Sequence, residues 1–176
     1  MGYVMIAMTG IIVFIISVVI IKYRQHEEKK YYDAAQQMVR EEYLTASLRS
    51  FDEQEYVSAV IPMMYLKRCG QKQKQGYVFN PEREITIGRD KNNNSIWVPF
   101  STVSMRHCTI CLYEGNVYLR DDNSANGTSV KKGFHNYHVI NNEYIELETK
   151  DKITVGEAVF RVTIFYFQTI KKLGER

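Results

Sequence analysis

The feature that most constrains this chain is an apolar run without charged residues near its amino-terminal end, from Gly2 to Ile21. About 20 apolar residues in a helix are enough to cross a hydrocarbon core of about 30 Å. A cleaved signal peptide is the alternative, but no basic residue precedes the run and no small-x-small cleavage site precedes Lys22. The sequence therefore predicts an uncleaved transmembrane helix over residues 1–21.

The charges that flank this run predict its orientation. No Lys or Arg precedes it, whereas basic residues follow it closely, namely Lys22, Arg24, Lys29 and Lys30. Basic flanks stay on the cytoplasmic side of a membrane. We therefore expect a single-pass protein of the cell membrane whose carboxyl-terminal part is cytoplasmic.

Residues 22–58 are predicted to form a helical juxtamembrane linker. The stretch His26–Ser58 has neither Gly nor Pro and is rich in Glu, Gln, Ala and Arg, and its apolar residues form an imperfect helical stripe. The helix must end before Pro62, because the residue before a proline avoids the α region. The stripe is too short for a coiled-coil prediction, so a plain spacer and a helix that pairs with another chain both stay open.

Residues 59–170 follow a different pattern, with many short apolar or alternating runs such as Ile85–Ile87 and Thr109–Tyr113. Turn-forming clusters such as Asp90–Asn94 separate them. Short strands at regular intervals are typical of an all-β sandwich, and the lack of strand–helix alternation argues against a Rossmann-type fold. Residues 171–176 remain as a basic tail.

The three cysteines, Cys69, Cys108 and Cys111, argue against a disulfide-stapled secreted domain, because their number is odd and their spacing forms no framework. Cys108 and Cys111 have the C-x-x-C spacing of redox and zinc motifs. They fall in a predicted strand, however, where residues three apart point to opposite faces. No second cysteine pair completes a zinc site, so we expect structural thiols in a reducing compartment.

Three short motifs occur at the edges of predicted strands, namely Gly88-Arg89, Ser104-Met105-Arg106-His107 and Asn126-Gly127. Each is commonplace alone. Their order and placement resemble the Gly-Arg, Ser-x-x-His and Asn-Gly motifs of FHA (forkhead-associated) domains. The resemblance extends from about Ile61 to Phe167 and leaves out the amino-terminal helical segments.

The resemblance implies an FHA-like β-sandwich of the SMAD/FHA type, with eleven strands and apical loops that bind phosphothreonine peptides. A phosphate carries about −1.5 to −2 charges and three acceptor oxygens. Arg89 would meet it with a planar fork of donors and Ser104 with a hydroxyl, while Asn126 would contact the peptide backbone. The resemblance also implies supporting roles for the motif residues Gly88, His107 and Gly127.

The chain departs from the family pattern at two positions. Met105 stands where the family commonly has Arg, Lys or Asn reaching the phosphate, and Ala125 lacks the hydroxyl that Thr or Ser often supplies before the Asn. Arg106 would point the other way in an extended segment. These departures suggest weaker phosphate binding, or a module kept for phosphate-independent contact.

Two functions therefore stay open. The first is a membrane-anchored cytoplasmic phosphothreonine reader that recruits partners phosphorylated by a Ser/Thr kinase. The second is a phosphate-independent scaffold subunit of a membrane assembly, such as a secretion or division complex. The compact layout of anchor plus FHA-like domain indicates a bacterial inner membrane in either case, and the sequence does not predict an oligomeric state. Thr45, if phosphorylated, would be a candidate self-ligand.

Other functional classes find little support. The sequence contains no nucleophile elbow, P-loop or H-E-x-x-H motif, so we expect neither an enzyme nor a cofactor. The net charge of +3 without a long basic tract does not favour nucleic acid. His135 and His138 lack a third metal-ligand candidate nearby. Lys131 and Lys132 either help to attract an acidic ligand or form a solvated hairpin tip.

Overall fold

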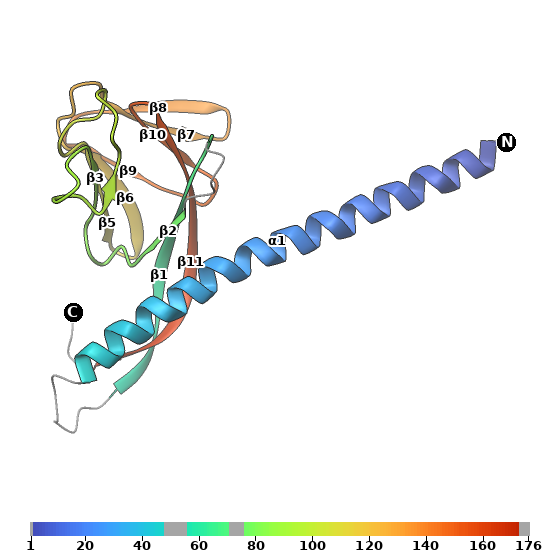
Figure 1. Ribbon diagram of the computed structural model, residues 1–176, viewed down its shortest axis with the longest axis horizontal. Coiled ribbons are helices and arrows are strands. Elements are labelled where there is room, and N and C mark those ends of the chain that lie inside the picture. Colours follow the sequence, from blue (N-terminus) through green and yellow to red (C-terminus); the bar gives the residue numbers. More distant parts are fainter. Residues whose placement is uncertain (1, 48–55, 71–75, 173–176) are drawn as a thin grey trace. The chain divides into compact units, whose positions relative to one another are not determined.

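A computed structural model describes residues 2–47, 56–70 and 76–172 of the chain (Figure 1). The chain divides into two compact units, Met1–Phe51 and Asp52–Arg176. The described part of the first unit is one helix, α1 (Gly2–Ser47), and that of the second is a pair of β-sheets.

Helix α1 is uninterrupted, so the predicted transmembrane segment and the start of the predicted linker belong to one helix. Ser17 donates its hydroxyl to the carbonyl of Val13 at 2.8 Å, the local bond that satisfies a polar group in an apolar helix. Side chains 1–7 and 9 of the predicted span lie outside the described residues, as does the side chain of Thr45. Within the described part of the chain, no helix is apolar over a length that would cross a membrane, and the anchor predicted for residues 1–21 is not supported there.

The second unit is an all-β sandwich of a six-stranded and a five-stranded sheet, as the resemblance to FHA domains implied. The six-stranded sheet has the order β2-β1-β11-β10-β7-β8 and the five-stranded sheet the order β4-β3-β5-β6-β9. The strands are β1 (Tyr56–Arg68), β2 (Gly76–Phe79), β3 (Ile85–Gly88), β4 (Ile96–Trp97), β5 (Cys108–Tyr113), β6 (Asn116–Asp121), β7 (Thr128–Lys132), β8 (His135–Val139), β9 (Tyr144–Glu146), β10 (Lys152–Val155) and β11 (Ala158–Lys172).

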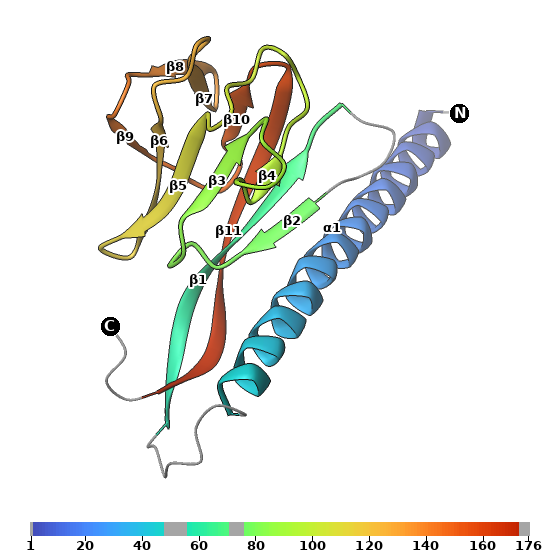
Figure 2. The same ribbon diagram turned by 60° about the vertical axis from the view of Figure 1, so that its left-hand side comes forward.

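Strand β1 pairs over its whole length with β11, from Tyr56 opposite Lys172 to Arg68 opposite Phe160. They form a long ribbon that extends beyond the other strands (Figures 1 and 2). Residues 56–58, predicted as helical linker, and residues 171–172, predicted as tail, belong to these strands. Residues 56–58 pair through their backbone with residues 170–172, which are far away in the sequence. Local helix propensity does not reveal such a long-range pairing.

One apolar core fills the space between the two sheets. Side chains alternate along each strand between this core and the outside. On β10, for example, Ile153 and Val155 are buried, whereas the alternate residues Lys152 and Thr154 are partly exposed. The largest fully buried side chain among the described residues is Phe160, and burying a side chain of this kind contributes about 1.5–3 kcal/mol.

The cysteines of the C-x-x-C motif lie on β5 and face opposite sides of its sheet, as predicted. Cys108 is fully buried in the core and Cys111 is only partly buried. Burial raises the pKa of the Cys108 thiol, and the nearby Asp121 carboxylate adds to the effect. Both sulfurs are free thiols.

Candidate functional site

The three sequence motifs meet at one end of the sandwich because of how three neighbouring strands pair. Ile87, at the end of β3, lies opposite Cys108, at the start of β5. Cys108 in turn lies opposite Asp121, at the end of β6. The loop after β3, the loop before β5 and the loop after β6 therefore lie next to one another, and they carry Arg89, Ser104 and Asn126 respectively.

Backbone hydrogen bonds tie the first loop to the second. The Arg89 N–H donates to the carbonyl of Ser104 at 2.9 Å, and the Asp90 N–H donates to the carbonyl of Met105 at 3.2 Å. Gly88 makes this approach possible, because a Cβ there would clash with the Met105 carbonyl and lie 2.8 Å from the Asn94 amide. Gly88 thus has the supporting position that the resemblance implied.

His107 ties the second loop to the third, and its ring is fully buried. Its Nδ1 accepts the Ser104 N–H at 3.1 Å, so the ring proton is on Nε2 and is donated to the Gly127 carbonyl at 3.1 Å. Gly127 has a φ of +73°, a left-handed backbone conformation that glycine adopts without strain. His107 and Gly127 therefore hold the geometry of the loops.

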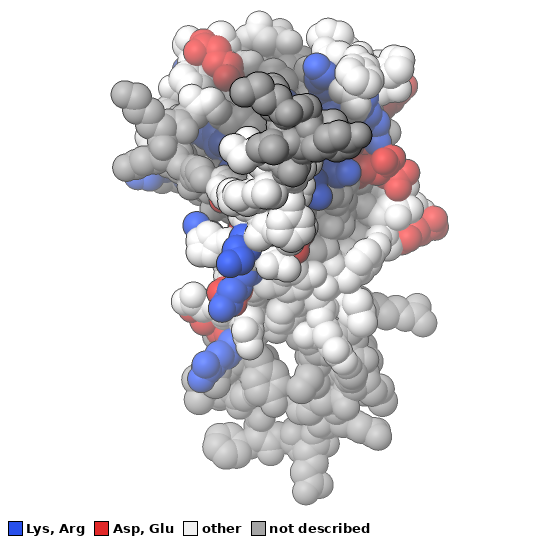
Figure 3. Space-filling view, turned by 90° about the vertical axis from the view of Figure 1, so that its right-hand side faces the viewer, with Lys and Arg blue, Asp and Glu red and all other residues white. Residues whose placement is uncertain are grey.

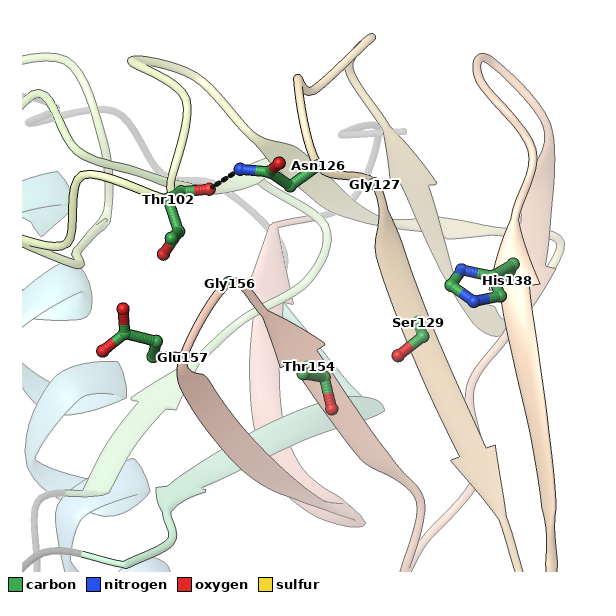
Figure 4. A pocket seen from close by; sticks show the side chains of 8 residues that line it. All are labelled: Thr102, Asn126, Gly127, Ser129, His138, Thr154, Gly156 and Glu157. Carbon is green, nitrogen blue, oxygen red and sulfur yellow. Dashed lines mark hydrogen bonds between the residues drawn. The ribbon is translucent and has the colours of Figure 1, made fainter.

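Ser104 and Asn126 each use part of their hydrogen-bonding capacity inside the protein. The Ser104 Oγ accepts the Ala125 N–H at 3.0 Å, which leaves its own hydroxyl proton to donate. The Asn126 Nδ2 donates to the Thr102 carbonyl at 2.8 Å, which orients the amide (Figure 4). The Oδ1 of Asn126 bonds to no group in the described part of the chain.

Arg89 is exposed, and within the described residues its guanidinium has no ion-pair or hydrogen-bond partner. The adjacent loop residue Met105 is 57% exposed. Arg106 is engaged elsewhere: its Nε donates to Asp122 Oδ2 at 2.9 Å and its guanidinium to Thr109 Oγ1 at 3.0 Å. Arg106 therefore does not stand in for the basic residue that is missing at Met105.

Two aspartates beneath the loops, Asp121 and Asp122, were not among the predicted site residues. Asp121 is fully buried and accepts hydrogen bonds from the Ser124 N–H at 2.7 Å, the Ser124 hydroxyl at 2.7 Å and the Thr128 hydroxyl at 2.5 Å. It therefore fixes the start of the loop that carries Asn126. In the sequence, Asp121 is marked only by its place at a strand end, three residues before Ser124.

Asp122 binds two guanidinium groups, those of Arg106 at 2.9 Å and Arg120 at 3.0 Å. Burial acts to raise the pKa of Asp122, but hydrogen bonds from Thr109 and the two arginines outweigh it. The pKa of Asp122 therefore lies below its ordinary value. This cluster keeps Asp122 ionised and stabilises the outer side of β5 and β6.

A pocket of about 340 Å³ begins at Asn126 and continues over the six-stranded sheet (Figure 4). Its lining comprises loop residues and side chains of β7, β8 and β10, namely Thr102, Asn126, Gly127, Ser129, His138, Thr154, Gly156 and Glu157. Within the described residues no group of His, Cys, Asp and Glu side chains could hold a metal ion, and His135 and His138 form no such group.

Residues 85–156 match the family model of the FHA domain. The chain is also similar to several solved FHA structures. An FHA domain of an Arabidopsis thaliana hypothetical protein is 20% identical with a TM-score of 0.50, over 66% of this chain and 90% of that one. An FHA domain studied for its phosphothreonine-dependent interactions is 25% identical with a TM-score of 0.47, over 57% of this chain and 94% of that one.

A third similar structure is Mycobacterium tuberculosis EmbR in complex with a low-affinity phosphopeptide, which is 24% identical with a TM-score of 0.48. The match covers 57% of this chain and 24% of EmbR. No match was found among curated proteins. The family model and the Arabidopsis structure agree with the sandwich described above.

Proposed function

We propose that this chain, which carries an FHA domain, is a phosphothreonine reader that works at a membrane. The observation that carries the proposal is the unused bonding capacity of three neighbouring side chains. The Arg89 guanidinium, the Ser104 hydroxyl proton and the Asn126 Oδ1 have no partner in the described part of the chain. They lie on loops that His107 and backbone bonds hold together.

These groups match the chemistry of a phosphorylated peptide. A phosphate dianion takes charge-assisted hydrogen bonds from a guanidinium and a hydroxyl, and the amide oxygen of Asn126 is free to accept a peptide N–H. Charge-assisted bonds contribute about 1.5–3 kcal/mol each. Two such bonds would favour the phosphorylated over the unphosphorylated peptide by a factor of about 100 or more.

The test is binding of the full chain, solubilised in detergent, to a degenerate phosphothreonine peptide library and to its unphosphorylated and phosphoserine counterparts. We expect Arg89→Ala to weaken phosphothreonine binding by about a hundredfold. Arg89→Lys is the matched control, since it keeps the charge but loses the planar fork, and we expect an intermediate affinity. Neither variant should change stability, because Arg89 is exposed and unpartnered. Wild-type affinity in Arg89→Ala would contradict the mechanism.

The membrane part of the proposal rests on the uncharged run from Gly2 to Ile21 and on the basic residues that follow it. In α1 the apolar side chains of this run that are described are largely exposed, for example Phe14 at 69%. We infer that this segment keeps the FHA domain on the cytoplasmic side of a membrane, where it recruits partners phosphorylated by a Ser/Thr kinase. Extraction of cell membranes with alkaline carbonate tests the anchor: retention in the pellet is expected, and release into the supernatant would contradict it.

A scaffold that ignores phosphate is the second candidate, and Met105 favours it. Its exposed thioether stands beside Arg89 where a further cationic donor would strengthen phosphate binding. A scaffold would retain its partners in a pulldown after phosphatase treatment, whereas a reader would lose them. The same pulldown with Arg89→Ala separates the two candidates, because only the reader depends on that guanidinium.

A further inference from the structure

The outer face of the six-stranded sheet carries basic side chains in register. Backbone pairing places them on four neighbouring strands, Lys67 of β1 opposite Arg161 of β11, Arg161 opposite Lys152 of β10, and Lys152 opposite Lys131 of β7. We call these four residues the basic row. Neighbouring strands are about 4.8 Å apart, so the row spans about 14 Å. Side chains alternate between the two faces of a strand. Ile153 and Val130, which are sequence neighbours of Lys152 and Lys131, are fully buried, so the row lies on the face away from the core.

Much of the positive charge of the basic row is uncompensated. Within the described residues, Lys131, Lys152 and Arg161 have no hydrogen-bond or ion-pair partner, whereas Lys67 already interacts within the chain. Lys132, next to Lys131, is different, because its Nζ pairs with Glu148 at 3.1 Å and with Asp151 at 3.4 Å. Figure 3 shows the charged side chains on one face of the molecule, where Lys and Arg are coloured blue and Asp and Glu red.

The basic row is continuous with the pocket that begins at Asn126. Thr154 lies two residues after Lys152 on β10, Ser129 lies two residues before Lys131 on β7, and both line the pocket. Two residues along a strand correspond to about 6.6 Å. A peptide that extends from Asn126 through the pocket (Figure 4) to Thr154 and Ser129 therefore reaches the row about two residues beyond them.

We propose that the basic row binds an acidic segment of the same phosphoprotein that occupies the loops. This inference rests on the proposed reader function and adds a partner class, a phosphothreonine followed or preceded at short distance by a run of Asp and Glu. Crossing 14 Å in extended form takes about four or five residues. Glu157, at the loop end of the pocket, lies away from the row and disfavours acidic side chains close to the phosphothreonine.

The test compares peptides that share one phosphothreonine core and differ in a five-residue tail, placed at either end. One tail contains Asp and Glu, a second contains Asn and Gln, and a third peptide combines the acidic tail with unphosphorylated threonine. The full chain in detergent is used as wild type and as the triple variant Lys131→Gln, Lys152→Gln and Arg161→Gln. The matched control removes the same charge from exposed positions of α1, with Lys29→Gln, Lys30→Gln and Arg40→Gln.

We expect the acidic tail to tighten binding by about tenfold in the wild type and the control, since exposed ion pairs are individually weak but three act together. The triple variant should bind acidic and neutral tails equally. The gain should shrink as ionic strength rises. Binding of the neutral-tailed phosphopeptide depends on the loops alone and reports separately on the reader function.

Equal affinity of acidic and neutral tails for the wild type would overturn the basic-row proposal and leave the reader intact. Retention of the gain in the triple variant would also overturn it, because another surface would then bind the tail. Absence of binding by both phosphopeptides would overturn the reader and the row together. Short-chain phosphatidylserine is a fourth ligand, and if it binds through the row while the acidic tail adds nothing, the row contacts lipid headgroups and the proposal fails.

Discussion

The loop end of the sandwich contains two layers that contrast in how their polar groups are used. In the buried layer, both ring nitrogens of His107 are bonded, and Asp121 accepts three hydrogen bonds. In the exposed layer, Arg89 has no described partner and Ser104 retains a free hydroxyl proton. The lower layer fixes positions and the upper layer keeps bonding capacity for a ligand, so mutations in the two layers should have separable effects.

The largest expected effect comes from breaking the buried layer. In His107→Leu, a side chain of similar size that cannot hydrogen-bond replaces the ring, so the Ser104 N–H and the Gly127 carbonyl lose their partner in a buried site. We therefore expect the free energy of unfolding to fall by about 2–4 kcal/mol. Urea unfolding of the full chain measures this loss. Phosphopeptide affinity should fall as well, because the loops lose their connection.

His135→Leu is the control for this measurement, since His135 is exposed on β8. We expect its free energy of unfolding to lie within about 0.5 kcal/mol of the wild type. If His107→Leu unfolded at the same urea concentration as this control, the ring would not be the connector described here. The contrast between the two layers would then not hold.

An intermediate effect, on phosphopeptide affinity, should come from adding a cationic hydrogen-bond donor to the exposed layer. The backbone of Met105 is fixed, because its carbonyl accepts the Asp90 N–H at 3.2 Å and the Asn94 Nδ2 at 2.7 Å. Met105→Lys therefore adds a cation beside Arg89 without moving the loop, and we expect phosphothreonine binding to tighten by up to about tenfold with stability unchanged. Isothermal titration measures the affinity.

Met105→Gln is the matched variant, of similar length but without charge, and it should give little gain. If Met105→Lys bound phosphopeptide no better than Met105→Gln, the position would not face the phosphate. That outcome would favour the scaffold candidate over the reader.

The smallest effect should appear in the pH dependence of stability. The pKa of Asp122 is lower in the folded chain than in the unfolded chain, so its contribution is present above about pH 4, the ordinary Asp pKa, and is lost as pH falls through the lower folded-state value. The free energy of unfolding of the wild type should therefore fall more steeply with acidification below pH 4 than that of Asp122→Asn. Parallel urea titrations at several acidic pH values measure the difference, and identical slopes would contradict the assignment.

The strands and the three loop motifs were predictable from the sequence because their signals are local. Gly88, Arg89 and Ser104 each sit within a few residues of a strand boundary that the alternation of apolar residues marks. The connections between loops were not predictable. The Ala125 N–H, for example, donates to the Ser104 Oγ, and a backbone hydrogen bond leaves no mark on residue type.

The register of pairing between strands that are distant in the sequence was likewise not predictable. Lys131 was weighed as a ligand-attracting residue or a solvated hairpin tip, yet its neighbours in the basic row, Lys152 and Arg161, come from other strands. A shift of one residue in any pairing would have turned one of these side chains to the opposite face. Tyr56 shows the same limit, since its strand conformation depends on pairing with Lys172.

The ribbon of β1 and β11 has a mechanical consequence. The chain enters the sandwich at Tyr56 and leaves it at Lys172, which are paired at the far end of the ribbon, whereas β11 begins beside the pocket loop that contains Gly156. A bound partner that pulls on the loop end, against an attachment before Tyr56, loads the two strands lengthwise. Their thirteen paired positions then share the tension in shear and do not peel apart one by one.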